Sequence, residues 1–438
     1  GLRFFFAVFV FALLFIAMPF LKTSYAGETV ALGPLLEEAK ANNPELRALR
    51  ERASAKEARV KAEGALDDPA LKIEMEDLSK DRPLNIFPED AMQTKYTISQ
   101  MFPFPGKLSL KEKIALKEAY AAMAAFNSMD LDVAARVKEA YFDYAYLADS
   151  IRITEEIKWL LSNMSKIAEA KYSVGQASQQ DVIKVNVEIT MLINDLITLK
   201  AEKDVAAARL KSILNRDQSS PIGEPAGLPR ERVEFRTDEL IEAAGRANPD
   251  IKMAELDMEA GELAADLARK NYYPDFMVGV GPVQRDGRFD SFDVMFQINI
   301  PIWWGKYDSL TREAVSNAGA LRSRLVSEKN AKSFEVKGAS IQVDAADRMR
   351  TLYETSLLPQ VELSLESALK NYRAGKIDFL TLLDTERELK KTRLEYLKTI
   401  LEYRKMVAAL ERTVGEDLHT ASTGTLYKNS AILEEDIR

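Results

Sequence analysis

The sequence predicts a mainly α-helical chain in which very long helical hairpins are combined with four short β-strands. The stretch Lys107–Val174, bounded by Gly106 and Gly175, contains neither glycine nor proline, and apolar residues recur along it at helical spacing. At about 1.5 Å per residue, such a helix would be roughly 100 Å long. A second run without either helix breaker follows from Gln176 to Ser220. A long helix, a glycine turn and another long helix predict a deep αα-hairpin.

Four segments have a different period, because apolar and polar residues alternate along them. In the first, Leu71, Ile73 and Met75 alternate with Lys72 and Glu74. A period of two is typical of a β-strand with one apolar and one polar face. The four strands are expected at about 70–78, 94–102, 274–281 and 291–301, with a turn at 285–288 between the last two.

The helices and strands occur twice along the chain. Pro249 follows Pro44 by 205 residues, and Pro274 follows Pro69 by the same distance, each at an equivalent helix boundary. The Gly-Lys pairs after the strands and the Tyr-x-x-Gly turns recur at offsets of 199 and 200 residues. Four landmarks in one order predict a tandem duplication. The expected divisions are a signal peptide at 1–26, a first repeat at 27–220, a linker at 221–236, a second repeat at 237–414 and a polar tail at 415–438.

The first 26 residues have the pattern of a secretory signal peptide. Leu2–Phe20 is almost wholly apolar, and Ser24-Tyr25-Ala26 is a small-x-small cleavage pattern that would leave Gly27 first. The alternative is an uncleaved membrane anchor, since the apolar run is nearly long enough to span a bilayer. Both interpretations place the rest of the chain outside the cytoplasm.

The composition argues against several functions. A net charge of -8 without a basic block is unfavourable for nucleic-acid binding. The chain has no cysteine, which excludes disulfides, thiolate metal sites and a thiol nucleophile. It also has no phosphate-binding loop, nucleophile elbow or His-Glu-x-x-His motif, so we expect neither enzyme activity nor a cofactor. The single histidine, His419, lies in the tail and the fourteen methionines are scattered, so we expect no metal site.

The four strands have a length that suits a membrane. About ten residues is the length of a tilted membrane-spanning β-strand, and a polar second face suits a water-filled lumen. Four strands cannot close a barrel, and their open edges would leave backbone groups unsatisfied in lipid. Several copies would therefore share one barrel: two chains give eight strands and a filled interior, whereas three give twelve and room for a channel. The alternative is a pair of soluble hairpins packed by one face on helices.

Together these features resemble the TolC family of outer-membrane efflux proteins. The resemblance covers essentially the whole chain after the leader, and rests on the Asn-Pro helix restarts, the strand hairpins, Gln100 to Lys107, Tyr273-Pro274-Asp275 and the paired Tyr-x-x-Gly turns. It implies a homotrimer in the outer membrane of a Gram-negative bacterium, with a twelve-stranded β-barrel on a periplasmic α-helical barrel. It also implies a passive exit duct of a tripartite pump, whose partners are a periplasmic adaptor and an inner-membrane transporter.

The sequence leaves the cargo open. The Phe104-Pro105-Gly106-Lys107 passage and the lack of a lipid-anchor cysteine look more like the heavy-metal efflux branch of the family than its secretion branch. Small organic molecules remain a further cargo class. One alternative is a TolC-type channel for protein secretion. Another, outside the family, is a periplasmic coiled-coil scaffold protein without channel activity.

The resemblance implies that the tunnel closes at the two glycine turns. Some members carry acidic residues six and nine positions after the second glycine; here these positions are Thr381 and Asp384, so only the second is charged. Threefold symmetry would make Asp384 a ring of three carboxylates that attracts cations. The alternative for Asp384 is a solvent-facing charge or an ion pair with Arg387. The candidate gate residues are Asp384, Thr381, Asp378, Asp181 and Lys184.

Two further groups of residues have candidate roles. In relatives the turns are the docking surface for the adaptor, although glycine there also suits a helix C-cap. Aromatic residues at strand ends suit a membrane interface, or else they pack between strand and helix. The docking residues are Val174, Gly175, Gln176, Ala374, Gly375 and Lys376, and the interface aromatics are Phe102, Phe104, Tyr272, Tyr273, Trp303 and Trp304.

Overall fold

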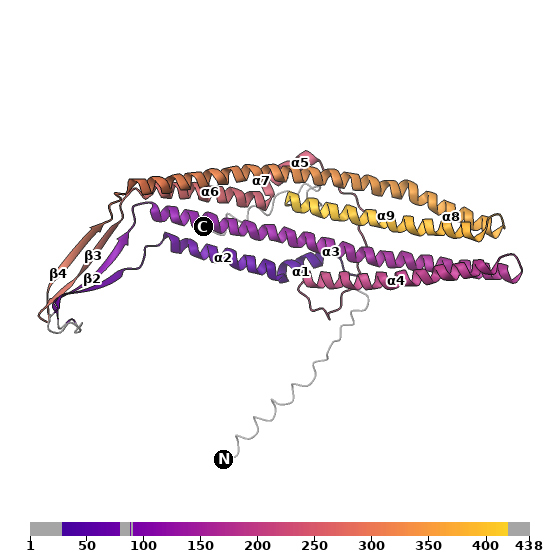
Figure 1. The fold of residues 1–438 in the computed structure, drawn as a ribbon, viewed down its shortest axis with the longest axis horizontal. Helices are drawn as coiled ribbons and strands as arrows, with labels where there is room; N and C mark the ends of the chain where they lie inside the picture. Colours follow the sequence, from indigo (N-terminus) through magenta and orange to yellow (C-terminus); the bar gives the residue numbers. More distant parts are fainter. Residues whose placement is uncertain (1–28, 79–87, 89–90, 419–438) are drawn as a thin grey trace, which may run out of the picture.

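The computed structural model describes residues 29–78, 88 and 91–418. The expected signal peptide and His419 lie outside the described residues. The chain is elongated, with a β-sheet at one end and long helices that run from it to two hairpin tips at the other end (Figure 1). Within the described ranges, no helix is long and apolar enough to cross a membrane.

The two halves of the chain contain the same elements in the same order, except that one long helix of the first half is divided in the second. The first half comprises α1 (Leu32–Asn42), α2 (Pro44–Gly64), β1 (Ala70–Leu78), β2 (Ala91–Phe102), α3 (Lys107–Ser173) and α4 (Gln179–Ile213). The second comprises α5 (Thr237–Ala247), α6 (Pro249–Lys270), β3 (Phe276–Arg285), β4 (Arg288–Ile298), α7 (Trp304–Leu352), the π-helical turn η1 (Tyr353–Leu357), α8 (Leu358–Arg373) and α9 (Phe379–Val414).

The division of the second long helix follows from a proline. Pro359 has no N–H to donate to the carbonyl four residues earlier, which belongs to Thr355. The helix widens into the turn η1 just before this proline and continues as α8. In contrast, α3 is a single helix of 67 residues.

The Asn-Pro pairs restart a helix in both halves. Asn43 is the N-cap of α2, where its side-chain oxygen accepts hydrogen bonds from the first-turn amides, and Asn248 caps α6 in the same way. Each asparagine also donates its side-chain N–H to a carbonyl near the end of a return helix, Ile213 at 3.1 Å and Thr413 at 2.7 Å. In each half, one asparagine therefore caps the start of a shorter helix, α2 or α6, and binds the end of the helix that returns from the tip, α4 or α9.

The strands form one antiparallel sheet in the order β1-β2-β3-β4. The halves are joined through it, because β2 pairs with β3 and Phe102 lies opposite Phe276. β1 and β4 are the two edges. β1 has the expected bounds, whereas β2 starts at Ala91 rather than 94. The turn between β3 and β4 lies at 286–287, where both residues have positive φ.

The second strand pair is displaced from the predicted segments 274–281 and 291–301. β3 runs on to Arg285 and β4 already starts at Arg288, so this hairpin reaches further toward its turn. At its other end, Phe276 is the first residue of β3 and lies opposite Ile298. β4 ends at Ile298, and only the Asn299 N–H beyond it still donates to the Asp275 carbonyl, at 3.0 Å, among the residues described just after the strand.

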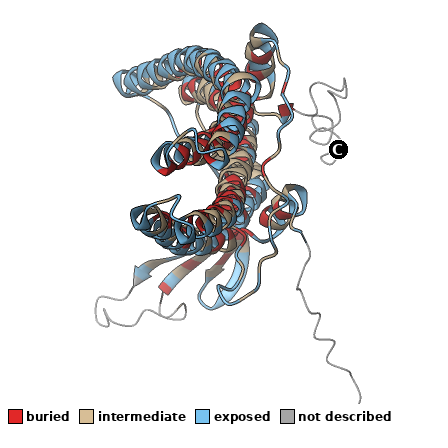
Figure 2. Ribbon diagram, turned by 90° about the vertical axis from the view of Figure 1, so that its right-hand side faces the viewer, coloured by how far each residue is buried: buried red, intermediate tan, exposed pale blue. Residues whose placement is uncertain are grey.

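The hydrophobic core lies between the helices rather than on the sheet. Val133, Val137 and Leu161 of α3 are fully buried, as are Leu382 and Ile400 of α9, and all five belong to one cluster. Viewed toward one end of the molecule, buried residues gather on the inward faces of the helices, whereas exposed residues cover much of the sheet (Figure 2). The sheet therefore contributes little to the hydrophobic core of the single chain.

Candidate functional site at the helical tips and the sheet

Both hairpin tips are shaped by a left-handed glycine. Gly175 and Gly375 have φ of 74° and 71°. The next amide, of Gln176 or Lys376, donates to the carbonyl five residues earlier at 2.8 and 2.9 Å, which is the Schellman arrangement. The six expected docking residues are all exposed. The structure thus has the C-caps, and the residues that form them are accessible.

Two of the expected gate carboxylates take part in capping the starts of helices. Asp181 and Ser178 form a capping box at the start of α4. Asp378 caps α9 by accepting the Thr381 N–H at 2.8 Å. Hydrogen bonds from Thr381 hold the pKa of Asp378 below its usual value. These contacts explain the acidic residues at both tips without reference to a lumen.

The third expected gate carboxylate, Asp384, belongs to a chain of charges that joins the two hairpins. Its side chain is 61 % exposed and lies 3.3 Å from Arg387 of the same helix. Arg387 also binds Glu188 of α4 at 2.6 Å, and Lys390 of α9 binds Asp195 of α4 at 2.6 Å. We call the pairs Arg387–Glu188 and Lys390–Asp195 the tip clasp, because they link the return helices α4 and α9.

A buried carboxylic acid lies next to the tip clasp. Glu386 of α9 is only 1 % exposed, and neither of its carboxyl oxygens has a hydrogen-bond partner. Burial, and then the nearby Glu188 carboxylate, raise the pKa of Glu386 from 4.5 to about 7. Sequence reasoning missed both Glu386 and the clasp, because the faces of α4 and α9 that meet cannot be read from either helix alone.

A further contact ties the first hairpin to the second glycine turn. Lys171, near the end of α3, donates to the Tyr372 carbonyl at 2.6 Å, and its Nζ lies 4.4 Å from the centre of the Tyr372 ring. Tyr372 is buried against Phe379, whereas its counterpart Tyr172 is exposed. The two Tyr-x-x-Gly turns therefore have the same backbone but different surroundings.

At the opposite end, a buried lysine holds the junction between sheet and helices. Lys107 Nζ donates to the Asp275 carboxylate at 2.8 Å and to the Tyr273 carbonyl at 3.1 Å. Asp275 also accepts the Phe104 N–H at 2.7 Å, and the Phe104 ring stacks on Tyr273 with 4.4 Å between centroids. The Gly-Lys and Tyr-Pro-Asp motifs of the sequence therefore meet in one contact between the two halves.

The expected interface aromatics divide between packing and exposure. Phe104 and Tyr273 stack on each other, and Tyr272 contacts Trp304 and Asp308. Some of the six still have large exposed areas on the described chain. These are Phe102, Tyr273, Trp303 and Trp304.

The sheet exposes one apolar face in addition to its two edges. The other face is charged, and ion pairs within the sheet, such as Lys95 Nζ to Glu76 Oε1 at 2.7 Å, partly neutralise it. A contiguous apolar surface of this kind marks contact with lipid or another protein. The exposed apolar residues are Leu71, Ile73, Ile98, Val278, Val280, Phe292, Val294, Phe296 and Ile298.

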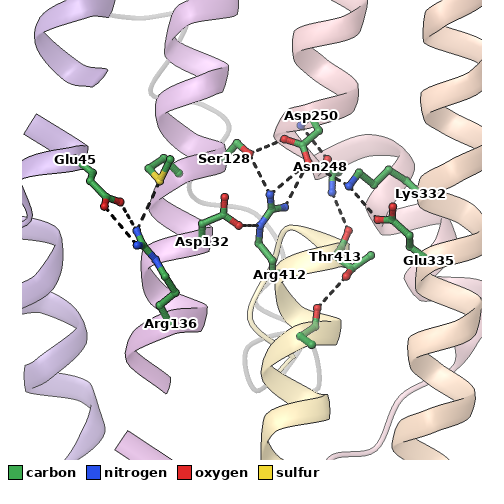
Figure 3. A network of polar contacts seen from close by, with 12 residues as sticks. Glu45, Ser128, Asp132, Arg136, Asn248, Asp250, Lys332, Glu335, Arg412 and Thr413 are labelled. Carbon is green, nitrogen blue, oxygen red and sulfur yellow. Dashed lines mark hydrogen bonds and ion pairs between the residues drawn. The ribbon is translucent and has the colours of Figure 1, made fainter. Parts of the chain in front are cut away.

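A polar network across four helices fixes the middle of the molecule (Figure 3). Arg412 of α9 binds Asp132 of α3 and lies 3.4 Å from Asp250 of α6, which also accepts from Ser128 and binds Lys332 of α7 at 3.2 Å. Burial would raise the pKa of Asp250, but the Ser128 hydrogen bond and the two cations hold it below its usual value. Among the described residues, no group of three or more His, Cys, Asp and Glu could hold a metal ion.

Comparison with known proteins identifies the family. The model of the outer membrane efflux protein family matches residues 35–216 and 240–416. The chain belongs to this family. Its membership confirms the resemblance to TolC-type proteins and favours a channel over a periplasmic scaffold. The two matched blocks also follow the two halves described above.

Two relatives of this outer membrane efflux protein have names that mention different compounds. The cobalt-zinc-cadmium resistance protein CzcC of Cupriavidus metallidurans is 20 % identical over 394 residues, which cover 88 % of this chain and 91 % of the relative. The toluene efflux pump outer membrane protein TtgF of Pseudomonas putida is 23 % identical over 338 residues, covering 70 % of this chain and 67 % of the relative.

Solved structures confirm the fold class. The outer membrane protein VceC of Vibrio cholerae superposes with a TM-score of 0.74 at 18 % identity, covering 88 % of this chain and 96 % of that one. CusC gives a TM-score of 0.74 at 18 % identity, with 88 % and 92 % covered. The mainly helical chain with four strands is therefore the fold of outer-membrane efflux channels.

Proposed function

We propose that three copies of this outer membrane efflux protein form the exit duct of a tripartite efflux pump. The sheet carries this proposal: one face is exposed and apolar, and both edges are unpaired within the chain. Three sheets of four strands make a closed twelve-stranded barrel, in which no backbone edge faces lipid. The long helices then continue the barrel as a tunnel on the periplasmic side.

Single-channel recording of the purified protein in a planar bilayer, together with its mass in detergent, tests this assembly. We expect a mass close to three times that of the chain and a small conductance, because the tips are closed at rest. A monomer that forms no channel and stays soluble without detergent would contradict the proposal.

We propose that the tip clasp keeps the duct closed at rest. It is supported by the two ion pairs between α4 and α9 and by the Lys171–Tyr372 hydrogen bond, which all join one hairpin to the other. An adaptor that docks on the exposed glycine turns would open the duct by separating α4 from α9. The inner-membrane transporter, rather than this chain, would supply the energy.

Asp384 is proposed to line the closed tip as a ring of three carboxylates. Its 61 % exposure supports this, because the ion pair with Arg387 leaves much of the carboxylate accessible. In bilayer recordings, Asp384→Asn should lower the preference for cations over anions, since one negative charge is lost from each chain. Asp344→Asn is the matched control, because Asp344 forms a similar exposed pair with Arg348 far from the tip. An unchanged preference in Asp384→Asn would exclude the ring.

For the cargo, we propose small solutes or metal cations, with metal cations favoured. The support is the match to CzcC, which spans 88 % of this chain, against 70 % for the toluene pump protein. Cations would be drawn to the proposed ring of Asp384 carboxylates as they leave. Protein secretion remains the alternative, and export assays with the cognate transporter distinguish the two.

A further inference from the structure

The unpaired edges β1 and β4 can be matched to each other residue by residue, because the chain already contains an equivalent contact. Within one chain, β2 of the first half pairs with β3 of the second half. In a closed ring of copies, β4 of one chain must meet β1 of the next, which is the same contact between the halves in the opposite order. The register of β2 on β3 can therefore be carried over.

We propose that β4 pairs with β1 of the partner subunit in the register that places Ile300 opposite Ile73 of the partner subunit. This register rests on the proposed trimeric duct and specifies the contact between β4 of one subunit and β1 of the next, which we call the seam. Two offsets between the halves define this register, one for β1 to β3 and one for β2 to β4.

The first offset comes from the helix boundaries. Pro69 and Pro274 precede β1 and β3, and Pro44 and Pro249 start α2 and α6. Both pairs are 205 residues apart. β1 therefore maps onto β3 by adding 205, so that position 73 corresponds to position 278.

The second offset comes from the two hairpins. Ile73 lies opposite Tyr96 in the first hairpin, and Val278 lies opposite Phe296 in the second. Because Ile73 and Val278 are equivalent, Tyr96 corresponds to Phe296, at an offset of 200 (296 minus 96). The tip glycines, Gly175 and Gly375, give the same offset, whereas the Gly-Lys pairs just after the strands give 199, so the second half is one residue shorter between its strand and that glycine.

These offsets convert the observed pairing into the pairing at the seam. Gln100 of β2 lies opposite Val278 of β3. Adding 200 to the first position and subtracting 205 from the second gives Ile300 opposite Ile73 of the partner subunit. By the same conversion, Asn299 lies opposite Glu74 of the partner subunit.

Side-chain chemistry independently supports this register. Directly opposite residues in an antiparallel pair lie on the same face. Here apolar Ile300 meets apolar Ile73 of the partner subunit, and polar Asn299 meets charged Glu74 of the partner subunit. A slip by one residue would place an isoleucine of β4 against a charged residue of β1. The register is therefore consistent with one lipid face and one polar face around the whole ring.

The free chain leaves the matching segment without a strand partner. In the first half, Gln100 and Phe102 extend beyond β1 and pair with β3. Their counterparts Ile300 and Ile302 lie beyond the end of β4 and are 69 % and 59 % exposed. Pairing with the next copy would give this segment a strand partner, as β3 gives one to Gln100 and Phe102.

The junction with the helices offers a further charge pair across the contact between subunits. Lys107 binds the Asp275 carboxylate and the Tyr273 carbonyl between the halves. The counterpart Lys306 forms no ion pair with a described residue and is exposed. Subtracting 205 from 275 and 273 gives Ala70 and Asp68, so the position that matches Asp275 has no carboxylate, and Asp68 just before β1 is the equivalent of Tyr273. The seam would bring Lys306 toward Asp68 of the partner subunit.

Disulfide cross-linking tests the register, because the chain has no cysteine of its own. The in-register variant carries Ile300→Cys with Ile73→Cys. The matched controls carry Ile298→Cys or Ile302→Cys with Ile73→Cys, two residues out of register on the same face. Opposite residues have Cα atoms about 4.5–5.5 Å apart, within disulfide range, whereas diagonal residues are about 7–8 Å apart and outside it. Each variant is first checked for its mass in detergent and then treated with a membrane-permeant oxidant.

We expect the in-register variant to form covalent dimers and trimers on a denaturing gel, at least several-fold more than either control. Preferential linkage of a control would overturn the register while leaving the trimer intact. Trimers that link in none of the three variants would show that these edges do not pair, and would also overturn it. A monomeric mass of the unsubstituted protein would instead reject the proposed function on which the seam rests.

Discussion

Glu386→Gln is expected to raise the free energy of unfolding, relative to wild type, by more at pH 8 than at pH 5. Glu386 is buried without a hydrogen-bond partner, and its pKa is raised from 4.5 to about 7. The folded state therefore holds the proton more tightly than the unfolded state. The stability that this provides is complete below about pH 4.5 and is lost as the pH rises through 7. Glutamine stays neutral and avoids this loss.

The size of the effect follows from the pKa difference. A rise of the Glu386 pKa from 4.5 to about 7 corresponds to roughly 3 kcal/mol at about 1.4 kcal/mol for each tenfold change, and relaxation around the charge reduces this to about 1–3 kcal/mol. Denaturant unfolding of both proteins at pH 5 and pH 8 measures the change. Glu388→Gln is the control, since Glu388 is exposed on the same helix. An equal difference between wild type and Glu386→Gln at both pH values would contradict the ionisation of this group.

The parts of the fold that depend on local chemistry could be predicted from the sequence. Asn43 and Asn248 each precede a proline and cap the helix that starts there. Gly175 and Gly375 take the left-handed conformation that ends a helix. The alternation in β1 placed that strand at its observed bounds. These features need no knowledge of the rest of the chain.

Features that depend on distant partners were not predictable in the same way. β4 ends at Ile298 because β3 begins at Phe276, and no signal near residue 298 records this. The burial of Glu386 follows from the approach of α4 to α9, which are almost 200 residues apart in sequence. Asp181 and Asp378 were predicted as gate residues from their places near the glycine turns, but their part in helix capping, Asp181 in a capping box and Asp378 as an N-cap, was not predicted.

The Lys390→Glu variant is expected to open the duct. Lys390 and Asp195 are 2.6 Å apart in the tip clasp, and glutamate would replace this attraction by repulsion. Each partly exposed pair contributes about 0.5–1 kcal/mol, and repulsion costs a similar amount, so each chain shifts by about 1–2 kcal/mol. If three tips open together, the total is about 3–6 kcal/mol. Roughly 5.5 kcal/mol converts an equilibrium from 1:99 to 99:1, so the closed state would lose most of its population.

The control for this variant restores the charge pair in reverse. Lys390→Glu combined with Asp195→Lys places opposite charges at the same two positions and should close the tip again. A non-specific disturbance of α9 would not be repaired by a second substitution on α4. Because salt screens this pair, the difference between the variants should also shrink at high ionic strength.

Single-channel conductance of wild type, Lys390→Glu and the charge-reversed double variant in planar bilayers is the most direct test of a duct gated at its helical tips. We predict a small conductance for wild type, a several-fold larger one for Lys390→Glu, and a return toward wild type for the double variant. The same small conductance in all three proteins would contradict the tip clasp as the gate.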